Sequence, residues 1–251
     1  MTTNESETKA GITSKADGFD EPADEGTNYG GSRKLFRNSA HNFGVTLSQQ
    51  EDYDWLAVMQ TCMLVDHLAD EEKTDISVAF DGIFSGEMHE NLDYDAQVRA
   101  HNYMHRQSEA KQQRIIELIA IVQALIKNQR DTSSVEELIE IRLSEATVLT
   151  ELLSLNVSDS DDAEARANFN SWLSSWAAVG YLLDSLIDMK ADYDNGESSV
   201  LPTKNSRLRL LKPLARESMK AIPATPVKVL GECALNGFNY VVRNNRADLT
   251  T

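Results

Sequence analysis

The sequence predicts an all-α protein folded as a single-domain helical bundle. Two segments, 53–73 and 163–193, are apolar on nearly every face along most of their length, which is typical of buried helices. The segments around them carry residues that start and stop helices. No stretch alternates apolar and polar residues over the length of a strand. A chain of 251 residues is long enough to bury one sizeable core.

The N-terminal part divides into a polar tail and the start of the helical domain. Residues 1–32 are rich in Gly, Ser, Thr, Asp and Glu, and we expect them to be disordered. Within them, residues 1–25 hold seven acidic and two basic residues, a net charge of −5. The helical domain is then expected to span 33–251, opening with a short helix or an anchoring arm over 32–48.

The middle of the chain is predicted to contain long helices separated by one loop region. The first is the buried helix at 53–73. Residues 76–95 contain two glycines and an NLDYD cluster, so we expect loops with one helical turn. Residues 96–128 follow the helical period and form either one long amphipathic helix or a broken pair.

The remaining helices are marked by their ends. Ser134 and Glu137 have the spacing of a capping box, which predicts a helix starting there. The helix at 163–193 is followed by Gly196, a candidate C-terminal cap. Two more helices are expected, around 205–220 and around 226–243, the second starting at a Thr–Pro pair.

Charge and composition exclude several classes of function. The net charge of −16 makes the chain a poor nonspecific partner for nucleic acid, whose phosphates it would repel. Its two cysteines, Cys62 and Cys233, imply no disulfide framework and favour a reducing compartment. With no secretory signal and no apolar run long enough to cross a bilayer, we expect a cytoplasmic protein whose membrane contact is at most peripheral.

The chemistry-bearing feature is a pair of acidic motifs on the two apolar helices. Asp184, Asp188 and Asp192 recur every four residues, which places them on one helix face. Asp66 and Asp70 have the same spacing near the end of the earlier helix. Such carboxylates repel one another when partly buried, and Mg²⁺ both prefers oxygen ligands and bridges to phosphates. The motifs therefore favour a site in which several Mg²⁺ ions bind a diphosphate between two helices.

These two motifs resemble those of the class I isoprenoid (terpenoid) synthases, most closely the squalene/phytoene synthase family. DHLAD matches that family's first acidic motif, and DSLIDMKAD matches its second. The stretch DYDNGESSVLPT is similar to the acidic segment that leads into an LP pair in that family. The resemblance covers roughly residues 38–203. It implies a helical bundle with a central cavity, and an enzyme that ionises an allylic prenyl diphosphate with Mg²⁺ and releases diphosphate.

The resemblance also implies roles for further residues. Phe43 lies in SAHNF, near where the family has a diphosphate-contacting segment, and Met63 stands where the family usually has an Arg. Arg142 is similar to the diphosphate-sensing Arg that cyclising terpene synthases place before their second metal motif. Met63 and Tyr181 are expected, with Cys62 and Met59, to line the pocket that holds the prenyl chain. Lys190, Arg207 and Arg209 are weaker basic candidates, and Lys190 is expected at the surface.

Three alternatives follow from the residues. Within the synthase hypothesis, coupling of two prenyl chains by a transferase and cyclisation of one chain by a lyase are both open. Met63 and the 59 residues after Asp192 favour cyclisation, whereas the triple-Asp spacing and the LP pair favour coupling. The second alternative is a non-catalytic helical scaffold that binds prenyl diphosphate. The third is a metal-dependent nucleotide hydrolase.

Overall fold

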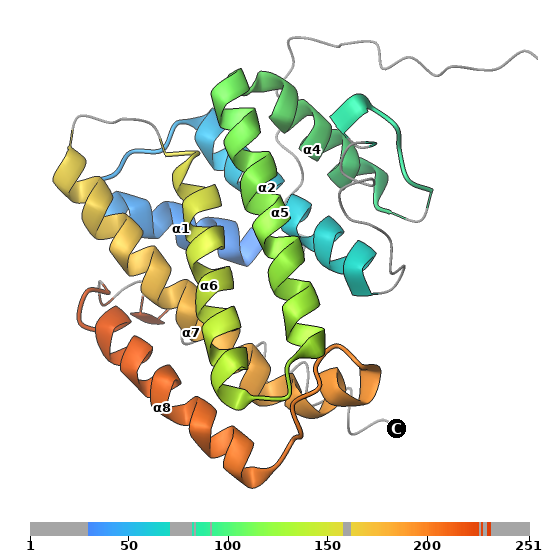
Figure 1. Ribbon diagram of the computed structural model, residues 1–251. Helices are drawn as coiled ribbons and strands as arrows, with labels where there is room; N and C mark the ends of the chain where they lie inside the picture. Colours follow the sequence, from blue (N-terminus) through green and yellow to red (C-terminus); the bar gives the residue numbers. More distant parts are fainter. Residues whose placement is uncertain are drawn as a thin grey trace, which may run out of the picture.

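The structure is a computed structural model of the chain. It describes residues 30–70, 82, 84–90, 92–157, 162–225, 227 and 230–231, and for residues 30–35, 63 and 65–70 it describes the backbone alone. Within these residues the chain forms seven α-helices and no strand (Figure 1), which confirms the predicted all-α class. The helices are α1 Gly30–Asn42, α2 Gln49–Asp70, α4 Tyr94–Arg106, α5 Glu109–Asp131, α6 Val135–Ser154, α7 Ala163–Asn195 and α8 Lys204–Ala221.

Most predicted helices lie where the sequence placed them. The alternative of a broken pair holds for 96–128, because α4 ends at Arg106 and α5 begins at Glu109. The segment 32–48 holds most of α1, which begins at Gly30, so residues 30–32 of the predicted disordered tail are helical. The described part of 76–95 is a helical turn followed by loop up to the start of α4 at Tyr94. Residues 1–29 of the predicted disordered tail lie outside the described residues, as does nearly all of the helix predicted at 226–243.

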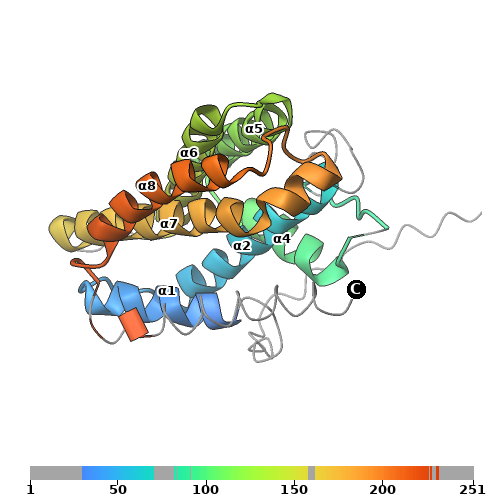
Figure 2. The same cartoon turned by 90° about the horizontal axis from the view of Figure 1, so that it is seen from below.

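Helix α7 runs through the middle of the bundle. Figure 2 shows α1 on one side of it and α6 and α8 on the other, and both α6 and α8 pack directly against it. Its N-terminal half contributes Phe169 and Trp172, whose rings lie 5.9 Å apart between centroids. Phe36 of α1 packs on Phe169, and Phe43 packs on both α7 rings. This aromatic cluster fixes α1 to α7 and forms the centre of the largest hydrophobic core.

Caps set the ends of the helices. Ser48 Oγ accepts from the Glu51 N–H, and the Ser48 N–H donates to Glu51 Oε2, so a full capping box starts α2. Before α6, Ser134 Oγ accepts from the Glu137 N–H as predicted, but the Glu137 carboxylate accepts from the Thr132 hydroxyl instead. At the end of α7, Gly196 has a φ of 77°, which confirms the predicted left-handed cap.

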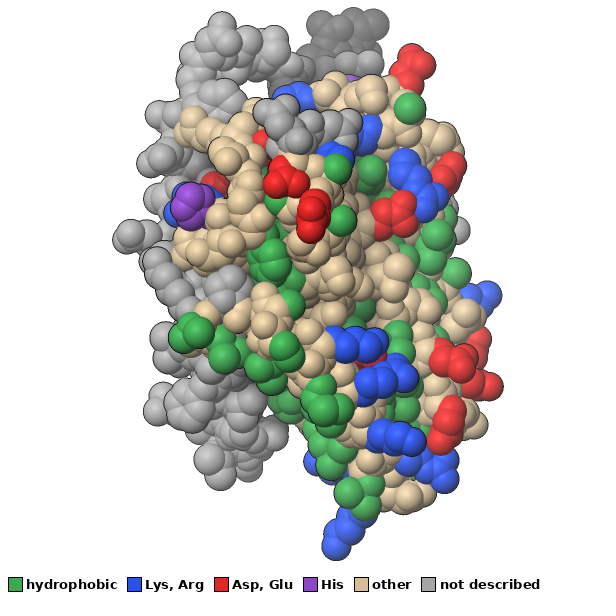
Figure 3. All heavy atoms as spheres, turned by 90° about the vertical axis from the view of Figure 1, so that its left-hand side faces the viewer, with side chains coloured by type: hydrophobic (Ala, Val, Ile, Leu, Met, Phe, Trp, Pro, Cys, Tyr) green, Lys and Arg blue, Asp and Glu red, His purple; other side chains and the backbone are tan. Residues whose placement is uncertain are grey.

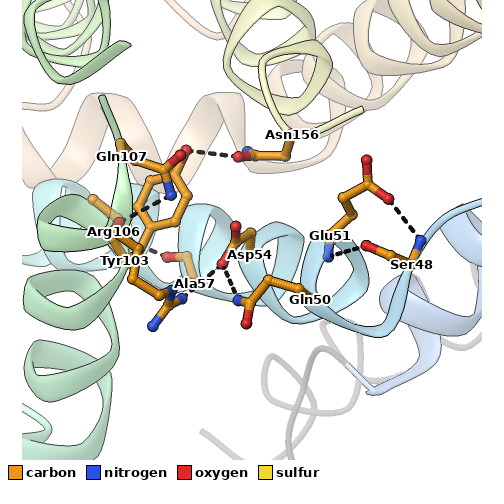
Figure 4. A network of polar contacts seen from close by, with 10 residues as sticks. Ser48, Gln50, Glu51, Asp54, Ala57, Tyr103, Arg106, Gln107 and Asn156 are labelled. Carbon is orange, nitrogen blue, oxygen red and sulfur yellow. Dashed lines mark hydrogen bonds and ion pairs between the residues drawn. The ribbon is translucent and has the colours of Figure 1, made fainter. Parts of the chain in front are cut away.

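A polar network joins α2 to α4 and α6 (Figure 4). Asp54 Oδ1 accepts from Gln50 Nε2 at 2.8 Å and from Arg106 at 2.7 Å. Tyr103 of α4 donates its hydroxyl to Asn156 Oδ1, just after α6, at 2.8 Å. Burial raises the pKa of Tyr103 far above its ordinary value, so this hydroxyl keeps its proton and remains a donor.

No helix in the described part of the chain is long and apolar enough to cross a membrane.

Candidate functional site

The last three turns of α7 carry the predicted acidic triad. Asp184, Asp188 and Asp192 are all helical and all partly buried, so their side chains share one face of α7 over about 12 Å of its axis. Helix α7 was predicted to be buried nearly all round, and at this end that is only partly correct, since several of its apolar residues are half-exposed and Gly180 is exposed. The triad therefore lies at a boundary between core and solvent.

Helix α6 brings a buried cation to this face. Arg142 and Glu145 are only 8% and 4% exposed. The Arg142 guanidinium donates to Ser185 Oγ of α7 at 2.7 Å and to Glu145 Oε2 at 3.0 Å. Its third nitrogen lies 3.8 Å from Asp192 Oδ2, within ion-pair distance. The guanidinium thus holds α6 and α7 together while facing one member of the triad.

Burial and neighbouring charges shift the pKa values of several groups at this site. Burial raises the pKa of Asp192 to about 7 against the lowering effect of Arg142, and the nearby carboxylates Glu197, Asp184 and Asp188 also act to raise it. Burial also raises the pKa of Glu145, with a smaller upward effect from Asp184. Burial alone would lower the pKa of Arg142, but Glu145, Asp184 and Asp192 raise it, so the guanidinium stays charged. This group of side chains would bind an added cation favourably.

Replacing Asp192 with Asn is expected to stabilise the protein at about pH 8, with the gain shrinking toward pH 4. In the folded protein Asp192 keeps its proton up to about pH 7, whereas the unfolded chain loses it near the ordinary pKa of 3.8. The folded state therefore binds more protons in this window, and stability falls as the pH rises through it. Urea unfolding of both proteins between these pH values measures the difference. Asp194→Asn is the control, since Asp194 is an exposed partner of Lys190; a wild-type-like pH profile in Asp192→Asn would contradict the prediction.

The DHLAD motif, with Asp66 and Asp70, lies on the helix expected to carry it. Asp66 falls in the last two turns of α2, and Asp70 is its final residue. In Figures 1 and 2, α2 and α7 run in the same general direction and end on the same side of the molecule. The side chains of Met63, Asp66 and Asp70 lie outside the described part of the structure. That Asp66 and Asp70 face the triad therefore stays a prediction.

The other predicted residues fall in different places. Phe43 lies in the aromatic cluster beside Trp172, twelve residues and about 18 Å along α7 from Asp184. Tyr181 is half-buried one turn before Asp184, on the same side of α7. Lys190 is exposed and pairs with Asp194, as expected for a surface cation, while Arg209 pairs with Glu136. The structure thus brings Arg142 and Tyr181 close to the triad, and it places Phe43 away from it.

Sequence reasoning missed three members of the site. Ser185 and Glu145 both bond to Arg142, and Glu197 lies close enough to raise the pKa of Asp192. Glu145 carried a readable signal, since an acid three residues after an Arg on a helix is within ion-pair reach. Ser185 carried none, because its role depends on how α6 packs against α7.

The described interior contains a small apolar cavity between α2, α4, α5 and α6. Its walls include Val58, Cys62, Met104, Ile119 and Leu152. Cys62 therefore lines this cavity, and its contact with a prenyl chain stays a prediction. The volume is about 20 Å³, enough for one water-sized group. A prenyl chain would have to widen this cavity by moving its walls.

Carboxylate oxygens are the donors that Mg²⁺ prefers, so the chemistry of Asp184, Asp188, Asp192 and Glu145 fits that ion. Their placement fits less closely: no three acidic, His or Cys side chains among the described residues converge on one point that could hold a metal. The arrangement is a row along a helix rather than a closed cage. Closing it would take ligands from elsewhere, and α2 carries the nearest predicted ones.

No family model, no curated protein and no solved structure matches this chain.

Proposed function

We propose that this protein is a Mg²⁺-dependent isoprenoid synthase that ionises an allylic prenyl diphosphate and releases diphosphate. The observation that carries the proposal is the buried Arg142 guanidinium beside a partly buried row of three aspartates. A cation and several carboxylates at a core boundary suit a ligand that is itself anionic and arrives with metal ions. The resemblance of both acidic motifs to the squalene/phytoene synthase family supports the same reading.

In this proposal the metal-holding residues are Asp184, Asp188 and Asp192 on α7, with Asp66 and Asp70 on α2. Mg²⁺ held there would supply the positive charge that stabilises the departing diphosphate. Arg142 would turn the nitrogen that faces Asp192 toward a phosphate oxygen and donate to it. Glu145 and Ser185 orient that guanidinium, because both are buried and bonded to it.

The apolar end of the substrate would lie against the core. The cavity beside Cys62 is lined almost entirely by apolar side chains, which would exclude water from a carbocation and prevent its early capture. Coupling of two chains and cyclisation of one are both compatible with this site. Product analysis with farnesyl and geranylgeranyl diphosphates separates them, since only coupling doubles the carbon number.

The decisive experiment is release of pyrophosphate from these two substrates in the presence of Mg²⁺. Asp184→Asn and Asp66→Asn are each expected to lower the rate by about 100-fold, because each removes charge that acts on the leaving group. Asp194→Asn is the matched control, since it removes the same charge from an exposed position of α7 outside the triad. It should keep the wild-type rate.

Three results would contradict the proposal. Full activity in both Asp184→Asn and Asp66→Asn would show that the acidic motifs hold no metal. Tight binding of prenyl diphosphate with Mg²⁺ but no pyrophosphate release would favour the non-catalytic scaffold. Hydrolysis of nucleoside triphosphates without turnover of prenyl diphosphates would favour the nucleotide hydrolase.

A further inference from the structure

Helix α8 has two apolar faces, and the described residues cover only one of them. Its inner face packs Leu210 and Leu214 into the same core cluster as Leu182 and Met189 of α7. Its outer face exposes four large apolar side chains, of which Leu208 and Met219 are 65% and 68% exposed. The other two are Leu211 and Ile222, the second at the C-terminal cap. We call these four residues the outer stripe.

The outer stripe is continuous and flanked by cations. At 100° per residue its four members fall within an arc of about 80° and extend about 21 Å along the helix. On the same wheel Arg207 borders one edge of the stripe, and Lys212 and Arg216 border the other. In Figure 3 hydrophobic side chains over α8 lie beside a group of Lys and Arg side chains in the lower part of the face.

The charge of α8 is opposite to that of the whole chain. The helix holds six basic residues and one acidic residue, whereas the chain carries −16. The acidic residue, Glu217, is buried and bonded to Arg216 and Lys220, so it offers nothing to a partner. Lys204, Arg207 and Lys212 are exposed and form no ion pair with any described residue. The exposed face of α8 therefore presents hydrogen-bond donors and apolar groups, with almost no acceptors.

The combination of exposed apolar side chains and exposed cations indicates what binds to the outer face of α8. A second copy of α8 would bring like charges together and be repelled. Residues 1–25 could supply negative charge but contain only three large apolar side chains, Met1, Ile12 and Phe19, to cover the stripe. A phospholipid surface supplies both needs, because its headgroup phosphates accept from Lys and Arg and its acyl boundary takes apolar side chains to a depth of about 5–10 Å.

We propose that α8 docks the protein on anionic membranes through the outer stripe and its flanking cations. The acidic remainder of the chain does not forbid this contact, because charges more than about 8 Å from the lipid surface are screened at physiological salt. Neither the stripe nor its cations belong to the triad, so this inference does not depend on the proposed catalysis.

Vesicle flotation with the full chain tests the proposal. The protein is expected to float with phosphatidylcholine vesicles that contain about 30% phosphatidylserine, and not with phosphatidylcholine alone, and high salt should weaken the binding. Because each surface cation raises the partition coefficient about fivefold, Lys204→Gln/Arg207→Gln/Lys212→Gln should lower it about 100-fold. Leu208→Ser/Met219→Ser should lower it as well, by removing buried apolar area.

The control is Ile116→Ser/Ile121→Ser, which removes two exposed apolar side chains from α5 and should leave partitioning unchanged. Absence of flotation with phosphatidylserine vesicles would overturn the proposal. Equal partitioning of the wild type and both α8 variants would also overturn it. A wild-type dimer in sedimentation that Leu208→Ser/Met219→Ser converts to monomer would assign the stripe to a protein interface instead.

Discussion

Arg142→Met is expected to lower the free energy of unfolding by about 3–5 kcal/mol. The substitution leaves the Glu145 carboxylate buried with no cation beside it and removes the donor to Ser185. It also removes the nearest cation from Asp192, whose pKa is already raised to about 7 by burial and by neighbouring carboxylates. Urea unfolding at about pH 8, above the pKa of Asp192, measures the loss.

A second variant separates the charge effect from simple loss of packing. Arg142→Met/Glu145→Met should recover most of the stability, since an apolar pair replaces a buried ion pair at little net cost. The control is Arg209→Met, which breaks the exposed ion pair with Glu136 and should cost less than about 1 kcal/mol. If Arg142→Met costs no more than Arg209→Met, the guanidinium is not the buried counter-ion described here.

The helices were predictable where a local signal marks them. Periodicity found the long helices, and Gly196 and Ser134 marked two of their ends. The helical pattern from Gln50 places the start of α2 within one residue of Gln49, and Ser48 and Glu51 carry the capping-box spacing that starts it. The break between α4 and α5 has no Gly or Pro to announce it.

The break between α4 and α5 depends on side-chain hydrogen bonds that the hydrophobic periodicity of the sequence does not reveal. The side chain of Gln112 in α5 donates to the carbonyls of Met104 and Gln107, which adds to the bond from the Gln107 N–H to the Met104 carbonyl at the end of α4. A glutamine in the first turn of the next helix is not a stop signal in any sequence rule. Ser108 and Glu109 do carry the residue types of a helix start, so the start of α5 has a local signal while the end of α4 has none.

The residues of the candidate site also divide into those that a local pattern predicts and those whose position depends on packing between helices. The spacing of Asp184, Asp188 and Asp192 fixes their common face, because it is a property of one helix. Arg142 was selected as the one cation of a largely apolar and acidic segment, and the structure places it at the triad. Phe43 was selected by its distance along the chain from Asp66, which carries no information on the direction in which α1 crosses α7. That direction comes from the aromatic packing.

Phe169→Ala is expected to lower the free energy of unfolding by about 3–5 kcal/mol. Phe169 is fully buried, and its ring lies 5.3 Å from that of Phe36 and 6.0 Å from that of Phe43 between centroids. Truncation would leave a cavity between α1 and α7 and remove three aromatic contacts at once. Leu201→Ala is the control, since Leu201 is an exposed apolar residue of the same order of size, and it should change stability by less than about 0.5 kcal/mol.

The same variant tests whether the core cluster and the acidic triad act independently. Phe169 precedes Asp192 by 23 residues on α7, about 34 Å along the helix axis, and the two side chains share no partner. The effects of Phe169→Ala and Asp192→Asn on unfolding should therefore add to within about 0.5 kcal/mol at about pH 8. A larger coupling energy in the double variant would mean that α7 transmits changes in α1 packing to the triad. The cluster would then set the geometry of the site as well as the stability of the fold.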